Sequence, residues 1–400
     1  MARRQRNTPP QLDNVVLQVG PMVSGGRSLA RLEDGRVCLV AFAVEGETVE
    51  VRFEKEHADY LEAEVVRVVE PSPQRVAPRC PVFGTCGGCQ LQHLAYPAQL
   101  DAKRAIVREQ LERIGGFRDI AVEPTIGMET PWVYRNHIRL STGQRDGDVG
   151  FVPRTRRGLL RIEHCDIADP LVNRLLPSLQ GKGRGLHQVQ IRNSPETGSY
   201  LVSPYIPGLE IESGQQHYIE RLAGFDFRVH QSSFFQTNAV QADRLVELVA
   251  RELPEHGRLL VDAYAGVGTF ARIFAGRFEQ VIAIEESATA IDDAKENLAG
   301  VPNVAICPGK VEQILPSLEI HPDVVLVDPA RPGCAPGVID AIAGMAPALV
   351  VYVSCNPSTL ARDLRRLADS GYTIERVTPI DMFPHTAHIE CVVRLERVSG

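Results

Sequence analysis

The sequence predicts an α/β protein in which a doubly wound parallel sheet follows a small β-barrel and a cysteine-rich central domain. From residue 258 onward, aliphatic runs typical of buried strands alternate regularly with helical segments, which indicates a parallel sheet. Residues 8–70 instead contain five short β-rich runs separated by turns, which is typical of a small barrel. Between these regions, three cysteines within ten residues indicate a bound metal or cluster.

Length and composition are those of a globular protein with two or three domains. The chain has 400 residues, of which 44% are hydrophobic and 23% are charged. No apolar stretch reaches the length of a membrane span, and residues 1–6 are not followed by an apolar signal region, so we expect a cytoplasmic protein with no membrane partner. The net charge of −7 argues against a uniformly basic nucleic-acid-binding protein but leaves room for a local basic groove.

The first module reads as a five-stranded barrel. Its runs end at turn sequences such as Gly25-Gly26 and Asp34-Gly35, and Cys38 lies in an apolar run that we expect in the core. Five strands in about sixty residues favour the OB type of barrel, a frequent binder of single-stranded RNA. Another small β domain remains an alternative, because periodicity alone does not distinguish the two. The predicted strands cover residues 14–19, 28–31, 36–43, 48–53 and 60–69.

Four cysteines form a candidate ligand set. Cys80, Cys86 and Cys89 lie close together, and glycines between the last two allow the backbone to wrap around an ion or a cluster. Cys165 is the candidate fourth ligand. Four thiolates fit either a cubane iron–sulfur cluster or a tetrahedral zinc ion. Zinc sites usually pair two Cys-x2-4-Cys motifs, whereas this chain has one such pair and two single cysteines, so the spacing favours iron–sulfur.

Two features follow the first three cysteines. Residues 97–115 predict a helix that begins at a proline and stops at Gly115-Gly116. Residues 131–165 contain seven arginines against three acidic residues, an excess of four positive charges. Such a face is suited to contact RNA phosphates, although a solvated surface without a partner fits the composition equally well. The arginines are Arg135, Arg139, Arg145, Arg154, Arg156, Arg157 and Arg161.

The first strands of the parallel sheet predict an adenosine cofactor. A strand over residues 259–263 leads into a turn with Gly266 and Gly268, which supply two of the three glycines of the dinucleotide-binding fingerprint. The second strand ends at Glu285, 23 positions after Asp262, where a carboxylate can accept hydrogen bonds from both ribose hydroxyls. This pattern leaves NAD and S-adenosylmethionine as alternatives.

The later strands bring acidic side chains to the same crevice. The fourth strand ends at Asp328, at the carboxyl edge where open α/β sheets bind ligands. The runs 373–380 and 388–395 fit a closing antiparallel hairpin, which is usual for methyltransferases and not for NAD dehydrogenases. Glu390 enters the sheet there, although in isolation it would be a surface strand residue.

Cys355 follows the fifth strand, residues 349–354, and precedes a helix for which Ser358 is the candidate N-cap. The positive end of a helix stabilises a thiolate, so we expect the pKa of Cys355 to be lowered. The alternative is an inert buried cysteine, which is the usual role of a lone cysteine in a strand.

Several motifs occur together in the last part of the chain. They are Ser354-Cys-Asn-Pro357 with Thr359, Arg362 and Asp363, preceded by Asp328-Pro-Ala-Arg331 and followed by His388-Ile-Glu390. Together they resemble the RNA uracil-C5 methyltransferase family, and the resemblance covers nearly the whole chain. The barrel is similar to the family's TRAM domain, and the form with both barrel and cluster is similar to the bacterial 23S ribosomal RNA enzymes. The family's four cluster ligands match Cys80, Cys86, Cys89 and Cys165.

The resemblance also implies roles for single residues. It makes Cys355 the nucleophile and Glu390 the base. Thr269 and Lys310 depart from the residues that relatives often have near the adenine. The positions that match cofactor-binding residues are Gln236, Tyr264, Gly266, Glu285 and Asp328.

The resemblance implies three domains and two cofactors. Residues 8–70 form the TRAM or OB-like RNA-binding barrel, and residues 71–92 and 126–235 form a central iron–sulfur domain of the α+β class. Residues 93–125 and 236–400 form a Rossmann-like, S-adenosylmethionine-dependent methyltransferase domain. The cofactors are S-adenosyl-L-methionine and a [4Fe-4S] cluster. The expected partner of this monomer is RNA, with 23S ribosomal RNA preferred and transfer RNA as the rival.

The implied chemistry explains the residue types. Carbon 5 of uracil is a poor nucleophile, so the ring must first be activated by addition at carbon 6, for which a thiolate is well suited. Cys355 would add to carbon 6, and Glu390 would later remove the carbon 5 proton. An iron–sulfur redox or radical enzyme is an alternative, but its motif of three cysteines spaced by three and two residues is absent from the sequence. A pure RNA-binding module would need neither side chain.

Overall fold

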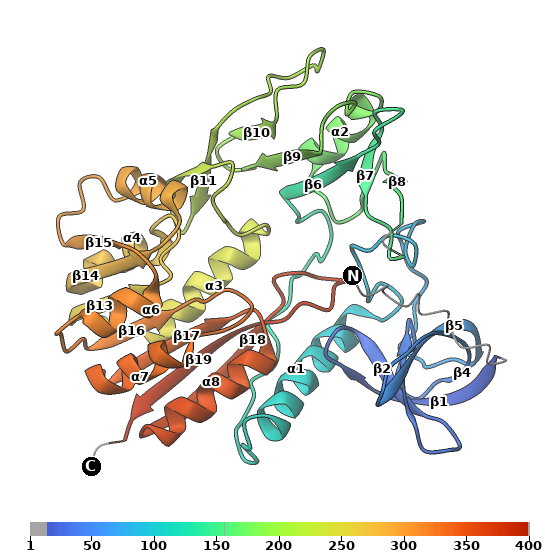
Figure 1. The fold of residues 1–400 in the computed structure, drawn as a ribbon, viewed down its shortest axis with the longest axis horizontal. Helices are drawn as coiled ribbons and strands as arrows, with labels where there is room; N and C mark the ends of the chain where they lie inside the picture. The colour runs from blue at the N-terminus through green and yellow to red at the C-terminus, as the bar shows by residue number, and fades with distance from the viewer. Residues whose placement is uncertain (1–13, 156, 399–400) are drawn as a thin grey trace, which may run out of the picture.

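The structure, a computed structural model, describes residues 14–155 and 157–398, whose strands form four sheets. Figure 1 shows a blue barrel formed by the first strands, a green central sheet, and an orange-to-red domain built on a seven-stranded sheet. A two-stranded hairpin is the fourth sheet. Among the described residues, no helix has the length and apolar character needed to cross a lipid bilayer.

The amino-terminal strands close into a barrel, as predicted. β1 pairs with both β2 and β4, and β3 runs parallel to β5. Alternate side chains point inward, so Cys38 lies in the barrel core with Val40 and Val49, as expected from its apolar run. The strands are β1 (Val15–Val23), β2 (Arg27–Arg31), β3 (Val37–Ala41), β4 (Thr48–Glu56) and β5 (Tyr60–Glu70). Residues 8–13 of the predicted module lie outside the described residues.

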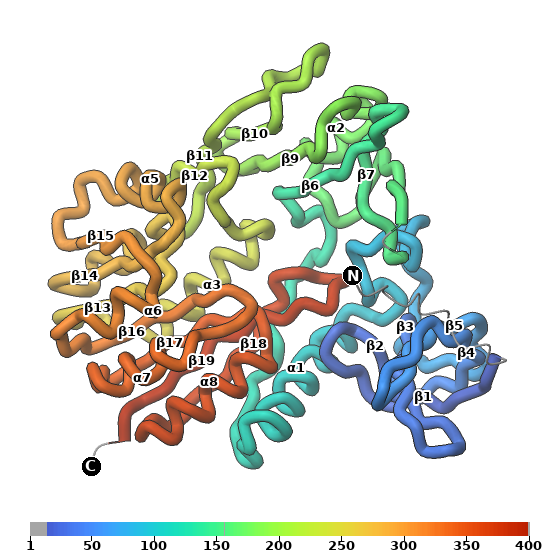
Figure 2. The backbone as a smooth tube through the Cα atoms, in the orientation of Figure 1, coloured from blue at the N-terminus to red at the C-terminus, as the bar shows by residue number. Residues whose placement is uncertain are grey.

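Helix α1 (Tyr96–Arg113) lies between the barrel and the seven-stranded sheet (Figure 2), where it packs on helix α8 (Pro357–Asp369). It starts next to Pro97 and ends before Gly115, close to the predicted bounds. Its Lys103 is buried, which is rare for lysine unless the ammonium group has a charged partner.

The central sheet is antiparallel with the strand order β10-β9-β6-β7-β8, and helix α2 packs against it. Asp169 caps this helix, because its carboxylate accepts a hydrogen bond from the Leu171 N–H at 2.7 Å. Strands β11 and β12 form the separate hairpin that leads into the next domain. The bounds are β6 (His137–Thr142), β7 (Val149–Phe151), β8 (Leu160–Arg161), α2 (Pro170–Leu179), β9 (Gln188–Asn193), β10 (Tyr200–Ser203), β11 (His217–Leu222) and β12 (Phe225–His230).

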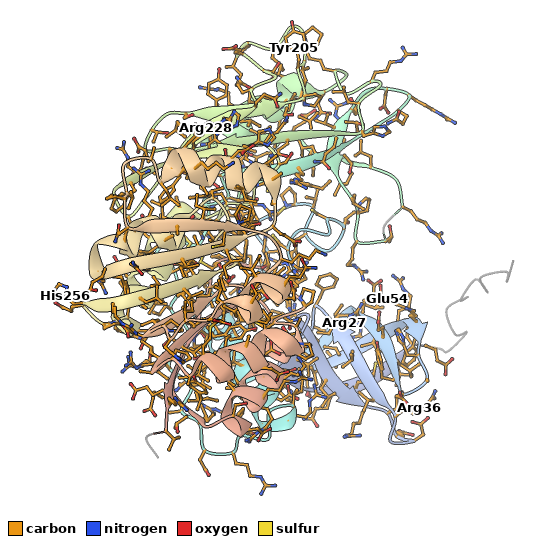
Figure 3. The ribbon with its side chains drawn as sticks, turned by 60° about the vertical axis from the view of Figure 1, so that its left-hand side comes forward. Arg27, Arg36, Glu54, Tyr205, Arg228 and His256 are labelled. Carbon is orange, nitrogen blue, oxygen red and sulfur yellow. The ribbon has the colours of Figure 1, made fainter. Side chains whose placement is uncertain are left out.

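Two of the predicted phosphate-contacting arginines are paired with carboxylates instead. Arg154 donates to Glu54 of the barrel at 2.6 Å and pairs with a second barrel carboxylate, while Arg27 also pairs with Glu54 at 3.0 Å (Figure 3). Arg161 pairs with two carboxylates near its own strand. Arg154 therefore links the central sheet to the barrel, and Arg161 forms ion pairs within the central region. Arg156, another of the predicted arginines, lies outside the described residues.

The seven-stranded sheet has the order β15-β14-β13-β16-β17-β19-β18. β13 to β17 are parallel, and β19 inserts antiparallel between β17 and β18, which confirms the predicted doubly wound sheet with a closing hairpin. The chain winds outward from β13 in one direction and from β16 in the other, so a crevice forms between these two strands. The bounds are α3 (Ala239–Glu252), β13 (Gly257–Ala263), α4 (Thr269–Phe274), η1 (Ala275–Arg277), β14 (Phe278–Glu285), α5 (Ala288–Asn297), β15 (Val304–Pro308), α6 (Val311–Ile314), η2 (Leu315–Ser317), β16 (Val324–Val327), α7 (Pro336–Met345), β17 (Leu349–Ser354), β18 (Tyr372–Ile380) and β19 (Glu390–Arg397).

Helices cover both faces of this sheet, so its central strands are apolar on both sides. Val351 packs in one core with residues of α3, α4 and α5, while the adjacent Val350 packs in a second core with residues of α1, α7 and α8. All six residues of β17 are buried. This explains why the strand reads as a continuous aliphatic run rather than an alternating one.

Candidate active site

A cavity of about 530 Å³ opens at the carboxyl ends of β13, β14, β16 and β17. Its volume falls in the range of small-molecule and cofactor sites, and it lies where an open α/β sheet binds its ligand. The structure brings together side chains that are far apart in the sequence. All the residues predicted to be catalytic or cofactor-binding line this cavity: Gln236, Tyr264, Gly266, Glu285, Asp328, Cys355 and Glu390.

The turn after β13 forms one wall of the cavity. Gly266 and Gly268 have φ angles of +56° and +82°, which suit glycine, but Tyr264 has +70°, a left-handed conformation that is rare for a bulky residue. The Tyr264 hydroxyl is buried without a hydrogen-bond partner, and a Cβ atom on Gly266 would meet no atom within 4 Å. This wall therefore leaves open space for a ligand beside Gly266.

Glu285 ends β14 with its carboxylate fixed by three backbone N–H groups. Oε2 accepts from Gly266 at 2.8 Å, while Oε1 accepts from Glu286 at 3.0 Å and Ser287 at 2.8 Å. A carboxylate has about four acceptor positions, so the group can still accept a hydrogen bond from a ligand. The side chain expected to meet ribose hydroxyls thus faces the cavity in a fixed orientation.

Gln236 reaches the cavity from the loop between β12 and α3. Asn238 ends this loop as the N-cap of α3, and its side chain accepts from the Gln241 N–H at 3.3 Å. Ser233, earlier in the loop, donates to the buried carboxylate of Asp293 at 2.7 Å. The loop is therefore fastened on both sides of Gln236.

Cys355 lies partly exposed between β17 and α8, where two predictions were wrong. Asn356 rather than Ser358 is the N-cap, because its Oδ1 accepts from the Ser358 N–H at 3.1 Å. Burial raises the pKa of the Cys355 thiol to about 11 instead of lowering it, and the carboxyl groups of Glu390 and Asp328 add to this rise. Desolvation and two acidic neighbours outweigh the helix dipole, so the thiol is protonated in the free protein.

Glu390 begins β19 and is only 4% exposed. Ser354 pairs with Cys391 at the end of the antiparallel ladder, and the next residues, Cys355 and Glu390, both line the cavity. Burial raises the pKa of Glu390, and the nearby Asp328 carboxyl raises it further. A carboxyl group whose pKa is raised in this way can take up and release a proton near neutral pH.

The four predicted ligand cysteines line a second, smaller cavity. Burial raises the pKa of each thiol, to about 12 for Cys89 and about 11 for Cys165. Within residues 14–155 and 157–398, however, no three His, Cys, Asp or Glu side chains are grouped closely enough to hold one metal ion. The donor set, four thiols around one cavity, suits an iron–sulfur cluster, which remains a prediction.

The chain matches known proteins over nearly its whole length. Residues 218–398 match the family model described as tRNA (uracil-5-)-methyltransferase. An uncharacterized RNA methyltransferase of Gloeobacter violaceus is 34% identical and covers 97% of both chains. Another, from Halalkalibacterium halodurans, is 32% identical over 96% of this chain and 97% of its own. The chain belongs to the RNA uracil-C5 methyltransferase family.

This family member is also similar to a solved structure. The tRNA (uracil-54, C5)-methyltransferase of Pyrococcus abyssi, in complex with S-adenosyl-L-homocysteine, has a TM-score of 0.73 and 27% identity, and the match covers 94% of this chain and 99% of that one. The present chain is therefore an RNA-methylating enzyme with the α/β fold of S-adenosylmethionine-dependent methyltransferases, and S-adenosylmethionine is its methyl donor.

Some cavity residues of this methyltransferase had no role assigned from the sequence. Arg331 and His388 belong to the matching motifs, and the structure places them at the cavity with 3.4 Å between Arg331 Nη2 and His388 Nδ1. Phe383 had no sequence signal, because it reaches the cavity from an irregular loop. Of the two departures from the family pattern, Thr269 lines the cavity and Lys310 does not.

Proposed function

We propose that this enzyme methylates carbon 5 of a uridine in RNA through a covalent adduct between Cys355 and carbon 6 of the base. The observation that supports the proposal is that Cys355 and Glu390, which adjoin the last paired residues of β17 and β19, both line the cavity that the cofactor-binding candidates also line. Both groups can then reach one pyrimidine ring while the methyl donor approaches from the other side.

The reaction is proposed in three steps. The sulfur of Cys355 loses its proton to solvent and bonds to carbon 6, which moves the ring electrons into an enolate. Carbon 5 of this enolate attacks the methyl group of S-adenosylmethionine and releases S-adenosylhomocysteine. The Glu390 carboxylate then removes the carbon 5 proton, and the carbon–sulfur bond breaks so that the double bond re-forms and the thiolate is freed. A base of this kind contributes about 10² to 10⁴ in rate.

The remaining side chains would position the two substrates. We propose that Gln236 contacts the methionine part of the donor, and that Tyr264, Gly266, Glu285 and Asp328 hold its adenosine part. The target base must leave its stack, which costs a few kcal/mol and is easier in a single-stranded loop than in a duplex. The barrel and the other arginines of the central region would contact the RNA backbone and offset this cost.

We propose 23S ribosomal RNA as the preferred substrate, on the resemblance of the barrel and cysteine arrangement to the bacterial ribosomal RNA enzymes. Transfer RNA is the second candidate, because the Pyrococcus abyssi neighbour is a tRNA (uracil-54, C5)-methyltransferase by name. Incubation of the purified protein with labelled S-adenosylmethionine and each RNA, followed by mapping of 5-methyluridine, distinguishes the two. Normal product formation by Cys355→Ala would refute the covalent mechanism.

We also propose that Cys80, Cys86, Cys89 and Cys165 hold a [4Fe-4S] cluster. Support comes from their shared cavity and from the sequence pattern of one Cys-x2-Cys pair with two single cysteines, which is unusual for zinc. When bound, the cluster would cross-link segments that are 76 residues apart, between positions 89 and 165. Iron, sulfide and zinc analysis of the protein purified without oxygen tests this proposal, and zinc without iron would refute it.

A further inference from the structure

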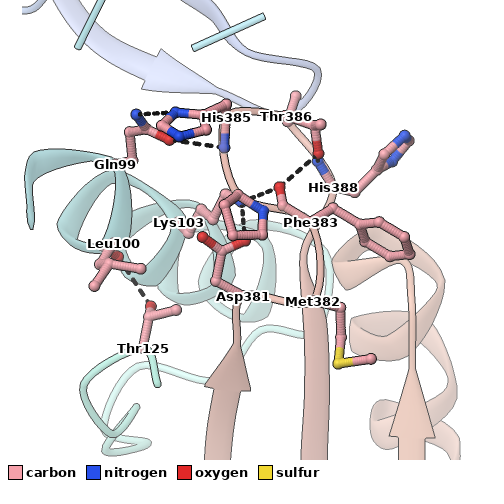
Figure 4. Close-up of polar contacts among 12 residues, drawn as sticks. Gln99, Leu100, Lys103, Thr125, Asp381, Met382, Phe383, His385, Thr386 and His388 are labelled. Carbon is pink, nitrogen blue, oxygen red and sulfur yellow. Dashed lines mark hydrogen bonds and ion pairs between the residues drawn. The ribbon is translucent and has the colours of Figure 1, made fainter. Parts of the chain in front are cut away.

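The segment between β18 and β19, residues 381–389, is called the catalytic loop here because it leads directly into Glu390. Phe383, His388 and Ile389 of this loop line the active-site cavity. The position of the loop therefore sets where the proposed base and its neighbours stand relative to Cys355. Figure 4 shows that the loop is held from the side by helix α1, far away in the sequence.

An ion pair fastens the first residue of the catalytic loop to α1. Lys103 Nζ lies 2.5 Å from Asp381 Oδ1, and both side chains are almost fully buried. The hydroxyl of Tyr96, also in α1, donates to Asp381 Oδ2 at 3.0 Å. Lys103 further donates to the main-chain oxygen of Phe383 at 3.3 Å. This start of the loop is thus fixed by charge-assisted hydrogen bonds in a dry environment.

His385 is the most constrained residue of the loop. Its φ of +66° is a left-handed conformation that few residues other than glycine adopt, so surrounding contacts must hold it there. Its N–H donates to Gln99 Oε1 at 3.1 Å, as Figure 4 shows, and its carbonyl oxygen accepts from the N–H groups of Gln90 at 3.0 Å and Leu91 at 2.9 Å. Its ring stacks on Trp132 with 3.7 Å between centroids.

Both sides of the cysteine cavity connect to this histidine. Gln90 directly follows Cys89, and its Oε1 accepts from the Ala387 N–H at 3.2 Å in addition to the backbone bond to His385. On the other side, Asp166 follows Cys165 and pairs with Arg79 at 3.0 Å.

Arg79 completes the second connection. Its guanidinium lies over the Trp132 ring at 5.2 Å, and Trp132 in turn stacks on His385. The segments that carry Cys89 and Cys165 are thus both connected to His385, which lies five positions before Glu390. A change in either segment would be transmitted to the catalytic loop through packed and hydrogen-bonded groups.

We propose that His385 is a positioning residue that couples the cysteine-bearing segments to the catalytic loop, so that the group held by the four cysteines fixes the place of Glu390. The inference rests on the proposed function for its catalytic consequence, but the coupling itself is a property of the loop. Through this coupling, the proposed cluster would contribute to methyl transfer by positioning Glu390, without any electron transfer.

The test compares Gln90→Ala and His385→Asn with Gln144→Ala, which removes a side-chain hydrogen bond in the central domain away from the loop. Gln90 is partly exposed, so its truncation is tolerated even if the histidine variant fails to fold. Hydrogen–deuterium exchange of residues 381–389, iron content, the KM for S-adenosylmethionine and kcat are measured on each protein.

We expect Gln90→Ala and His385→Asn to speed exchange in residues 381–389 and to lower kcat about 10-fold or more, because small misplacements of catalytic groups are costly. The KM for S-adenosylmethionine and the iron content should stay near those of the wild type, and Gln144→Ala should change nothing. Removal of iron from the wild type by a chelator should speed exchange in the same loop.

Unchanged loop exchange in Gln90→Ala and after chelation would overturn the coupling, as would faster exchange with full kcat. If the wild type itself methylates no uracil-containing RNA, the proposed function fails. The exchange data still decide the coupling in that case, because they do not depend on turnover.

Discussion

Cys355 and Glu390 adjoin Ser354 and Cys391, the last paired residues of the ladder between β17 and β19, and both line the active-site cavity. Burial, and then the Glu390 carboxyl group, raise the pKa of the Cys355 thiol, so the two groups are near enough to interact. The antiparallel insertion of β19 beside β17 therefore delivers a thiol and a carboxyl group to one wall of the cavity.

The first prediction concerns the two reactive side chains. Cys355→Ala should abolish both the RNA adduct and the methylated product, because it removes the proposed nucleophile. Glu390→Gln should accumulate a methylated covalent adduct, with turnover lower by about 10² to 10⁴. A gel that resolves protein from protein–RNA adduct measures this, and an adduct formed by Cys355→Ala would contradict the assignment.

The second prediction concerns pH. The pKa of Cys355 is raised to about 11, so the thiolate fraction should grow about tenfold per pH unit across the neutral range. Alkylation of Cys355 by iodoacetamide should accelerate accordingly with rising pH. Glu390→Gln removes a negative neighbour, which lowers the thiol pKa and should speed alkylation at pH 9. An alkylation rate independent of pH between 7 and 9 would contradict the raised pKa.

The third prediction concerns the ion pair between Lys103 and Asp381. Lys103→Met leaves a buried carboxylate without its cation, which should lower the free energy of unfolding by about 3 to 5 kcal/mol. The double variant with Asp381→Asn removes the charge as well and should recover part of this loss. Urea unfolding monitored by circular dichroism gives both values, and equal stability of the single and double variants would argue against an ionised pair.

The fourth prediction concerns Gly333, in the loop that carries Asp328. Its φ is +76°, and a Cβ atom there would lie 2.5 Å from Asp363 Oδ2 and 2.8 Å from Arg362 Nη2. Gly333→Ala should therefore cost about 1 to 3 kcal/mol of overpacking in addition to backbone strain. Gly300→Ala is the matched control, because Gly300 has a φ of +82° with no atom within 4 Å. Thermal unfolding should separate the two variants.

The fifth prediction concerns the cysteines. Cys165→Ser should lose bound iron, because a hydroxyl group replaces a thiolate ligand at the second cavity. Cys307→Ser, which alters a partly exposed cysteine that does not line that cavity, should retain the iron. Iron content and visible absorption after purification without oxygen measure the difference. Equal iron in the two variants would exclude Cys165 from the ligand set.

The sequence by itself determined the architecture and indicated several of the residues that line the cavity. Strand periodicity and turn residues are local properties, so they indicated the five-stranded barrel, the parallel sheet and the closing hairpin. The motifs placed Cys355, Glu285 and Asp328 at strand ends, and the carboxyl ends of parallel strands share one edge of a sheet. That geometric rule is why these residues meet in the cavity.

Only the tertiary structure decided the pKa values of this site and the ion pairs and hydrogen bonds that hold its residues in place. The pKa of Cys355 rises because burial and two acidic neighbours act on it, and neither is visible in the helix that follows it. The sequence predicts that Arg154 contacts phosphate, whereas in the structure it pairs with Glu54 of the barrel. The hydrogen-bond partners of His385 are Gln90, Leu91 and Gln99, which lie nearly three hundred residues away in the sequence. Desolvation and charge pairing depend on distances between remote segments, and such distances exist only once the chain has packed.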